Sequence, residues 1–168
     1  PRNKSMNADE VNFCPRCGST LVKALHFGRQ RPACAMFGWI YFADPKVAVA
    51  ALVEQKQSIL LVRRINEPQR GLWTLPAGFV DAEEDPVRAA ERDCLEETGL
   101  YVHVTGILDV LYGQEHPRGA HILIVYRAEI LSGEIRPGDD ADQAAFFDRQ
   151  SLPPLAFATT QRIIETAV

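Results

Sequence analysis

The sequence has no apolar run that approaches the roughly 18 residues needed to cross a bilayer. It has no excess of basic residues either, because 18 Lys and Arg stand against 22 Asp and Glu. The formal charge of −4 predicts no basic surface for nucleic acid or anionic membranes. Residues 1–11 lack the apolar segment of a secretory signal. The four cysteines are therefore expected to be free thiols in a reducing cytoplasm.

The remaining composition is that of a globular protein, with 46% hydrophobic and 24% charged residues. A length of 168 residues suits one α/β domain with a small appendage. Helices are expected over residues 86–98 and from Pro154 onward. Apolar runs between turn residues predict strands over residues 47–53, 58–62, 72–80, 102–111, 121–130 and 144–148, and the third of these is expected to be broken by Pro76 and Gly78. This order predicts an α/β fold in which a mixed sheet lies between helices.

The helix expected over residues 86–98 has the clearest signals. Asp85 is a good N-cap, Pro86 suits the first helical position, and Gly99 suits the position after the last turn. The apolar stripe that should face the core consists of Val87, Ala90 and Cys94. We expect the Cys94 thiol to act as a small hydrophobic core residue, because buried thiols generally do.

Three carboxylates share one face of this helix. Asp93, Glu96 and Glu97 stand at i, i+3 and i+4, where each like-charged pair costs roughly 0.2–0.5 kcal/mol. A bound cation would remove this cost, and carboxylate oxygens suit Mg²⁺ or Mn²⁺ rather than zinc. Such an ion can bridge phosphate oxygens and activate water, which points to phosphoanhydride hydrolysis. The alternative is an ordinary solvated acidic face.

Residues 78–100, GFVDAEEDPVRAAERDCLEETGL, resemble the Nudix box, G-x5-E-x7-R-E-U-x-E-E-x-G-U, in which U is aliphatic. Two positions depart from this pattern, because Asp93 replaces Glu and Cys94 replaces an aliphatic residue. The matching positions are Gly78, Glu84, Arg92, Glu96, Glu97, Gly99 and Leu100. Together with the terminal helix, the resemblance covers residues 47–168 and implies a Nudix α/β/α sandwich.

The resemblance implies a catalytic site that depends on Mg²⁺ or Mn²⁺. Its catalytic residues would be Glu84, Arg92, Asp93, Glu96 and Glu97. The metal ligands would be Asp93, Glu96, Glu97 and the backbone carbonyl of Gly78 or Ala77. Arg92 would orient the carboxylates through an ion pair with Glu84 or Glu96, and Gly78 would let the backbone approach the ion closely. Asp93 reaches about 1.5 Å less far than Glu would.

The resemblance also implies a catalytic base on a loop outside the box. The candidates, each otherwise an ordinary solvated acid, are Glu115, Asp139, Asp140 and Asp142. Gln143 stands where relatives with a similar loop often carry Glu, and an amide cannot act as a base. Arg64 and Trp73 are weaker candidates for contacts with the substrate's phosphate and base. Surface and core roles are their alternatives.

The segment Cys14-Pro-Arg-Cys17-Gly looks like one knuckle of a zinc ribbon. Cys34 begins a second knuckle, but Phe37 stands where the fourth cysteine is expected. The surrounding RPACAMFGWIYFADP otherwise resembles the ribbon that precedes the catalytic domain in some Nudix hydrolases. We therefore expect a small ribbon-like β subdomain over residues 1–44, before a catalytic domain over residues 45–168.

The zinc content of this ribbon is open at the level of sequence. Three thiolates make an incomplete tetrahedral set, so we expect substoichiometric zinc or none. His26 is one candidate for a fourth ligand. The alternative is a ribbon that has lost its metal and is held by the packing of Phe37, Trp39 and Phe42.

A ribbon followed by a Nudix domain resembles hydrolases acting on NADH, FAD or ADP-ribose. The NADH enzymes carry S-Q-P-W-P-F-P after the box, whereas residues 152–157 here read LPPLAF, which favours ADP-ribose or FAD. We expect a Mg²⁺-dependent pyrophosphohydrolase that cleaves a nucleoside diphosphate joined to another group. The alternatives are an NADH pyrophosphatase, a non-catalytic nucleotide sensor and a nucleic-acid-binding ribbon, which the net charge does not support. A homodimer is compatible with the resemblance.

Overall fold

The computed structural model of the protein describes residues 11–113 and 122–167. The chain forms two compact units, Pro1–Pro45 and Lys46–Val168. Among the described helices none is long and apolar enough to cross a membrane. The longest of them, α1 (Pro86–Thr98), has 13 residues.

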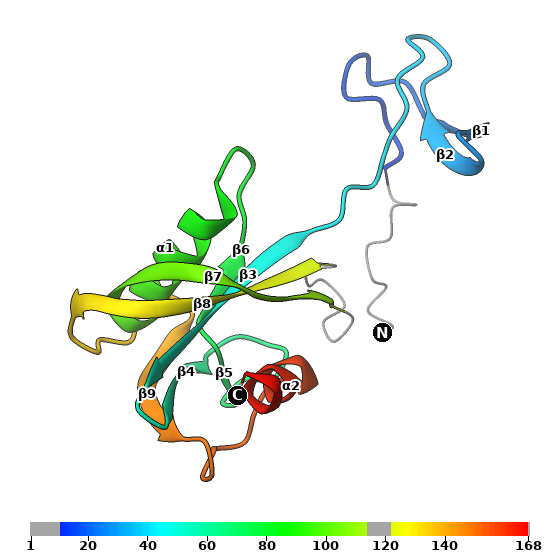
Figure 1. Ribbon diagram of the computed structural model, residues 1–168. Helices are drawn as coiled ribbons and strands as arrows, with labels where there is room; N and C mark the ends of the chain where they lie inside the picture. The colour runs from blue at the N-terminus through cyan, green and yellow to red at the C-terminus, as the bar shows by residue number, and fades with distance from the viewer. Residues whose placement is uncertain (1–10, 114–121, 168) are drawn as a thin grey trace. The chain divides into compact units, whose positions relative to one another are not determined.

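The smaller unit contains one antiparallel hairpin, formed by β1 (Val22–His26) and β2 (Arg29–Ala33) (Figure 1). Phe27 and Gly28 connect the strands with φ values of 51° and 74°. Positive φ at both positions suits a two-residue hairpin turn. This unit buries few side chains, and the buried ones among its described residues are Cys14, Pro32, Ala33 and Cys34.

The larger unit is built on a mixed seven-stranded sheet with the order β5-β4-β3-β8-β7, and β6 also pairs with β3 and β9 with β4 (Figure 1). Among its described strand pairs, β3 and β8 run parallel and the others antiparallel. The strands are β3 (Val47–Gln55), β4 (Ser58–Arg64), β5 (Trp73–Thr74), β6 (Ala77–Phe79), β7 (Leu100–Tyr112), β8 (Ile122–Gly133) and β9 (Ala141–Asp148).

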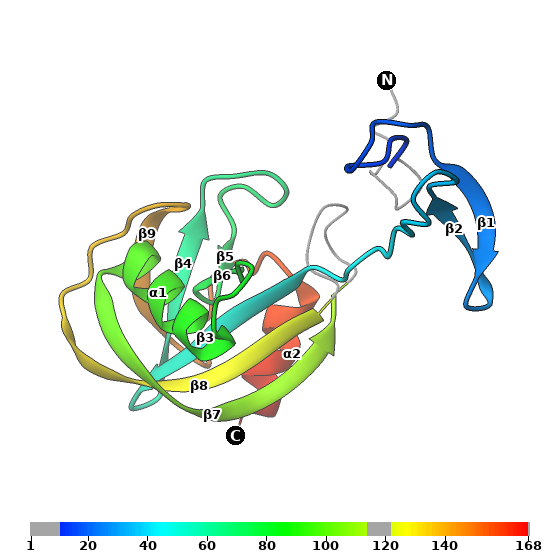
Figure 2. The same ribbon diagram turned by 90° about the horizontal axis from the view of Figure 1, so that it is seen from above.

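Successive residues of β3 contribute to two hydrophobic cores on opposite faces of the sheet. Ala51 belongs to the core that includes Cys94 of α1. Leu52 belongs to the core that includes Ile163 of α2 (Ala158–Thr166). Because side chains alternate between the faces of a strand, the two helices cover opposite faces, as both views show (Figures 1 and 2). The predicted α/β fold, with a mixed sheet between helices, is confirmed.

Helix α1 begins and ends where its capping residues predict. The Asp85 carboxylate accepts hydrogen bonds from the N–H groups of Val87 at 2.8 Å and Arg88 at 3.4 Å. Gly99 ends the helix with a φ of 76°, the left-handed conformation that glycine adopts without a steric cost. Cys94 is fully buried, so its predicted role as a core residue is confirmed.

The break predicted at Pro76 in the strand over residues 72–80 is confirmed, whereas no break occurs at Gly78, which lies within β6. The segment forms two short strands that pair with different partners, β5 with β4 and β6 with β3. Pro76 separates them because it has no N–H to donate to a ladder, while its carbonyl accepts a hydrogen bond from Ala51 at 3.0 Å. The chain therefore crosses from one part of the sheet to another at this proline.

The final helix begins at Ala158, later than the predicted start at Pro154. The Pro154 carbonyl accepts a hydrogen bond from the Trp73 N–H at 3.0 Å, and the Ala156 N–H donates to the Trp73 carbonyl at 2.7 Å. These two bonds hold residues 154–156 in an extended path beside β5, so the helix begins only after them.

Candidate active site

Asp93 and Glu97 lie on the face of α1 that meets β6, and each is 7% exposed. The Ala77 N–H donates to Oε2 of Glu97 at 2.9 Å. Gly78 lies next to Ala77, and a Cβ there would lie 2.4 Å from Oδ2 of Asp93. The Asp93 carboxylate thus occupies the space that a side chain at residue 78 would need. Strand β6 therefore lies against both acids, which are one helical turn apart on α1.

Asp93 has one satisfied and one unsatisfied carboxylate oxygen. Oδ1 accepts a hydrogen bond from Arg92 at 2.5 Å, whereas Oδ2 is buried without a partner among the described residues. Burial raises the pKa of Asp93 to about 6, although the Arg92 charge opposes the shift. An unpartnered buried carboxylate oxygen is unfavourable, and a bound cation would satisfy it.

The pKa of Glu97 is raised further than that of Asp93. Burial is the main reason that its pKa is raised to about 8, and the negative charges of Asp93, Asp140 and Asp139 raise it further, against the hydrogen bond from Ala77. The acids of α1 and of the loop before β9 are therefore close enough for their charges to interact. Such a concentration of negative charge fits a divalent cation with oxygen ligands.

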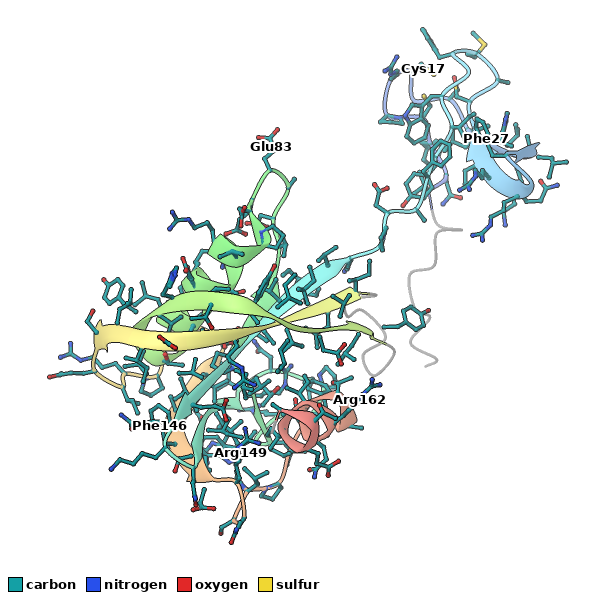
Figure 3. All side chains as sticks on the ribbon, viewed as in Figure 1. Cys17, Phe27, Glu83, Phe146, Arg149 and Arg162 are labelled. Atoms are coloured by element: carbon teal, nitrogen blue, oxygen red, sulfur yellow. The ribbon has the colours of Figure 1, made fainter. Side chains whose placement is uncertain are left out.

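Arg92 connects the remaining acids of the box. Its Nε and one terminal nitrogen donate to the two oxygens of Glu84 at 2.8 and 2.9 Å. The other terminal nitrogen contacts both Asp93 and Glu96, the latter at 3.1 Å. The hydrogen bonds from Arg92 are the main reason that the pKa of Glu84 is lowered to about 2. Glu83 stands at the tip of the loop before α1 and points away from this network (Figure 3).

A cleft of about 310 Å³ lies beside this cluster. Ala77 and Gly78 line the cleft and also contact the helix acids, so a ligand in the cleft lies next to the carboxylates. Arg64 forms part of its wall, with the guanidinium 5.1 Å from the centre of the Phe157 ring. The volume is at the lower end of the range of about 300–1,000 Å³ typical of small-molecule sites.

The loop acids proposed as bases occupy different surroundings. Asp140 lines the cleft and accepts a hydrogen bond from the Asn66 side chain at 2.6 Å. Asp142 instead accepts two hydrogen bonds from Arg63, at 2.9 and 2.8 Å, and the Arg63 side chain lowers its pKa. Glu115 lies outside the described residues.

Sequence reasoning missed several cleft residues and named one residue that lies elsewhere. Trp73 packs edge-on against Phe147, with ring centres 4.6 Å apart, and does not line the cleft. The missed residues include Asn66, Phe157 and Thr160. They are isolated polar and aromatic residues outside any motif, and they reach the cleft only because strands and loops distant in sequence meet there.

The model of the NUDIX domain family matches residues 44–166. The chain belongs to the Nudix family. An ADP-ribose pyrophosphatase of Methanocaldococcus jannaschii is 42% identical over 117 residues, which are 69% of each chain. The NAD-capped RNA hydrolase NudC of Chromobacterium violaceum is 30% identical over 92% of this chain, which spans only 57% of that relative. The crystal structure of a Nudix hydrolase from Nitrosomonas europaea has a TM-score of 0.82 and 30% identity, covering 92% of this chain and 88% of the other.

These Nudix relatives confirm the predicted family and the predicted class of enzyme. The protein is a hydrolase that acts on phosphoanhydride bonds. The Nudix domain of Shewanella oneidensis NrtR, solved with ADP-ribose, has a TM-score of 0.61 at 22% identity and so shares the fold. The Nitrosomonas europaea and NudC alignments also extend into the smaller unit, since each covers 92% of the chain.

The smaller unit of this Nudix protein brings three thiols together. The sulfurs of Cys14, Cys17 and Cys34 all lie within 4.8 Å of one another. Cys14 and Cys34 are buried, whereas Cys17 is exposed. Hydrogen bonding to Ser19 is the main reason that the pKa of Cys17 is lowered to about 7, and burial raises the pKa of Cys34. All four cysteines of the chain are free thiols.

The three aromatic residues suggested to pack this unit are not equally buried, because Trp39 is half-buried, with its ring centre 6.0 Å from that of Tyr41, whereas the other two are exposed. Phe37 is 61% exposed and Phe42 is 45% exposed, so neither belongs to a buried core. Phe42 is instead covered on one face by the Arg31 guanidinium, 4.5 Å from the ring centre. Phe37 carries no thiol, and its ring is largely exposed to solvent because the turn that contains it lies at the surface.

Proposed function

We propose that the larger unit hydrolyses the diphosphate bond of ADP-ribose, with FAD as the second choice, in a Mg²⁺-dependent reaction. The observation that carries this proposal is the buried pair of Asp93 and Glu97 beside the cleft. One Asp93 oxygen has no partner, and the Glu97 pKa is raised to about 8, so the site favours a cation. The 42% identical relative named as an ADP-ribose pyrophosphatase supports ADP-ribose over FAD.

Asp93, Glu96 and Glu97 would hold the ion, with the carbonyl of Gly78 or Ala77 as a further ligand. Hard oxygen donors of this kind suit Mg²⁺ or Mn²⁺. When bound, the ion supplies positive charge to the diphosphate and lowers the pKa of a coordinated water. Arg92 would keep Asp93 and Glu96 in place while its other hydrogen bonds anchor it to Glu84.

The cleft suits a ligand with a flat apolar part and a charged part. Apolar wall residues are Ala48, Ala50 and Leu123, and the Phe157 ring offers a surface on which a base can stack. Arg64 lies over that ring and can contact a phosphate. The diphosphate would then lie next to Gly78, at the carboxylate cluster.

We assign Asp140 as the general base, the carboxylate that accepts a proton from the attacking water, because it is in the cleft wall and Asn66 fixes its orientation. Asp140→Asn should lower kcat by about 100–10,000-fold, the usual range for a general base. The matched control is Asp142→Asn, since Asp142 is already engaged by Arg63. Steady-state kinetics at saturating Mg²⁺ tests the assignment, and equal losses in both variants would contradict it.

The substrate assignment is tested by measuring AMP release from ADP-ribose, FAD and NADH at matched concentrations, with Mg²⁺ and with EDTA. ADP-ribose should give the highest kcat/KM, and EDTA should abolish release. Binding of ADP-ribose by calorimetry without AMP release would instead support the nucleotide-sensor alternative. A higher kcat/KM for NADH would support the alternative of an NADH pyrophosphatase.

A further inference from the structure

Two turns of the smaller unit are built in the same way. The Cys14 carbonyl accepts a hydrogen bond from the N–H of Gly18 at 2.8 Å, and the Cys34 carbonyl accepts one from Gly38 at 2.9 Å. Both glycines have positive φ, 70° and 63° respectively. The turns are therefore equivalent, and each places its first cysteine, buried, toward the same cluster.

This equivalence assigns a position to Phe37. It stands one residue before the glycine, as Cys17 does in the first turn. Cys17 contributes the third sulfur of the cluster, whereas the Phe37 side chain has no ligand atom and is 61% exposed. Two equivalent turns thus supply three sulfurs where four would complete a tetrahedron.

The three sulfurs already have the spacing of metal ligands. The sulfurs of Cys17 and Cys34 are 3.6 Å apart. Zn–S bonds of about 2.3 Å in a tetrahedral site place sulfurs roughly 3.8 Å from one another. A disulfide would need about 2.05 Å. The cluster therefore fits an ion between the sulfurs.

His26 does not fill the fourth position. It pairs with Arg29 at the tip of the hairpin, whereas Cys34 directly follows Ala33, which pairs with Val22 at the other end. Four strand residues at about 3.3 Å each place these ends roughly 13 Å apart. Among the described residues, the group of candidate ligands contains the three cysteines and no histidine.

The smaller unit also needs a source of stability other than a hydrophobic core. Two of its four buried described residues, Cys14 and Cys34, belong to the cluster itself. Folded units of this size generally need disulfides or a metal ion to hold them, and these cysteines form no disulfide. A bound ion would link the two turns to the hairpin.

We propose that Cys14, Cys17 and Cys34 bind one zinc ion whose fourth coordination position is open to an exchangeable ligand, either water or a small nitrogen or sulfur donor. Binding converts three thiols to thiolates and releases their protons to solvent. Three protein ligands hold zinc less tightly than four. The purified protein should therefore carry less than one zinc per chain and take up one when zinc is supplied.

The test uses the full chain with a non-thiol reductant, first with Zn²⁺ and elemental analysis, then with Co²⁺ as a spectroscopic substitute for zinc. Wild type should bind one ion per chain, and added imidazole should shift its visible Co²⁺ absorption. Phe37→Cys should bind more tightly and show no imidazole shift, because the fourth position is filled. Cys94→Ala is the matched control, since Cys94 lies in the other unit, and it should behave as wild type.

Two results would overturn the proposal. One is failure of the wild-type chain to take up Zn²⁺ or Co²⁺. The other is a Co²⁺ spectrum of wild type that imidazole leaves unchanged, which would mean that the protein supplies a fourth ligand. His26→Ala should leave both uptake and the shift intact. Cys34→Ser removes one of the three sulfurs and should lose metal uptake. If this variant fails to fold, Cys17→Ser, at the exposed position, replaces it and should also lose uptake.

Discussion

A methyl group at Gly78 would lie 2.4 Å from Oδ2 of Asp93, although the glycine does not have a positive φ. Gly78→Ala should therefore displace the carboxylate and cost about 1–3 kcal/mol, the range for overpacking. We expect the melting temperature to fall by about 2–4 °C per kcal/mol, and turnover to fall with it. Gly106→Ala is the control, because an added Cβ there meets nothing within 4 Å. Calorimetric scans and kinetics of both variants check this, and equal behaviour would contradict it.

Asp93 differs from the family's Glu, and its unpartnered oxygen makes it the residue at which ion binding can be tested. Asp93→Asn keeps the size of the side chain but removes its charge, so the apparent Mg²⁺ affinity should fall by at least about 100-fold, above the 10–100-fold typical of residues that only orient ligands. Asp93→Glu restores the family residue and should keep turnover near the wild-type level. Mg²⁺ titrations of activity compare the three proteins. Identical Mg²⁺ dependence would show that residue 93 is not a ligand.

Among the elements, α1 shows what the sequence can predict. Its bounds follow from local signals at Asp85, Pro86 and Gly99, and the structure reproduces them. The pairing of β5 and β6 with different strands and the parallel pairing of β3 with β8 depend on contacts between distant segments, which local patterns do not encode. The same limit applies to the site. The acids of the box could be read from their spacing, whereas Asn66 reaches the cleft only through the fold.

The N-cap of α1 supports the helix that carries the acids. Asp85→Ala removes the acceptor for the N–H groups of Val87 and Arg88, and should cost about 1 kcal/mol. Asp85→Asn retains an acceptor oxygen and should cost much less. Thermal melts of the two variants distinguish a cap from a general effect of lost charge, because both remove the charge. Equal destabilisation would argue against the cap.

For the whole molecule, the acids of the site link stability to pH. In the ion-free fold the pKa of Glu97 is raised from 4.5 to about 8, so the folded chain keeps a proton that the unfolded chain loses. Stability must then fall as pH rises from about 4.5 to about 8. Asp93, with its pKa raised from 3.8 to about 6, acts in the same direction at lower pH. Glu84 acts oppositely, because its pKa is lowered to about 2 and its contribution is lost only in acid.

Among these three acids, Glu97 is the one that mainly titrates between pH 7 and pH 8, because Asp93, with a pKa of about 6, has lost most of its proton by pH 7. In EDTA the melting temperature of wild type should fall across this range, and Mg²⁺ should restore it most at pH 8, where binding to the native state adds to stability. Glu97→Gln has no proton to lose there, so its melting temperature in EDTA should be nearly flat and, at pH 8, higher than that of wild type. The same variant should lose turnover by at least about 100-fold, because a ligand that positions the ion is removed. Thermal melts at pH 6, 7 and 8, with EDTA and with Mg²⁺, measure this. Parallel pH curves for wild type and Glu97→Gln would mean that Glu97 is not the acid that couples ion binding to the stability of the fold.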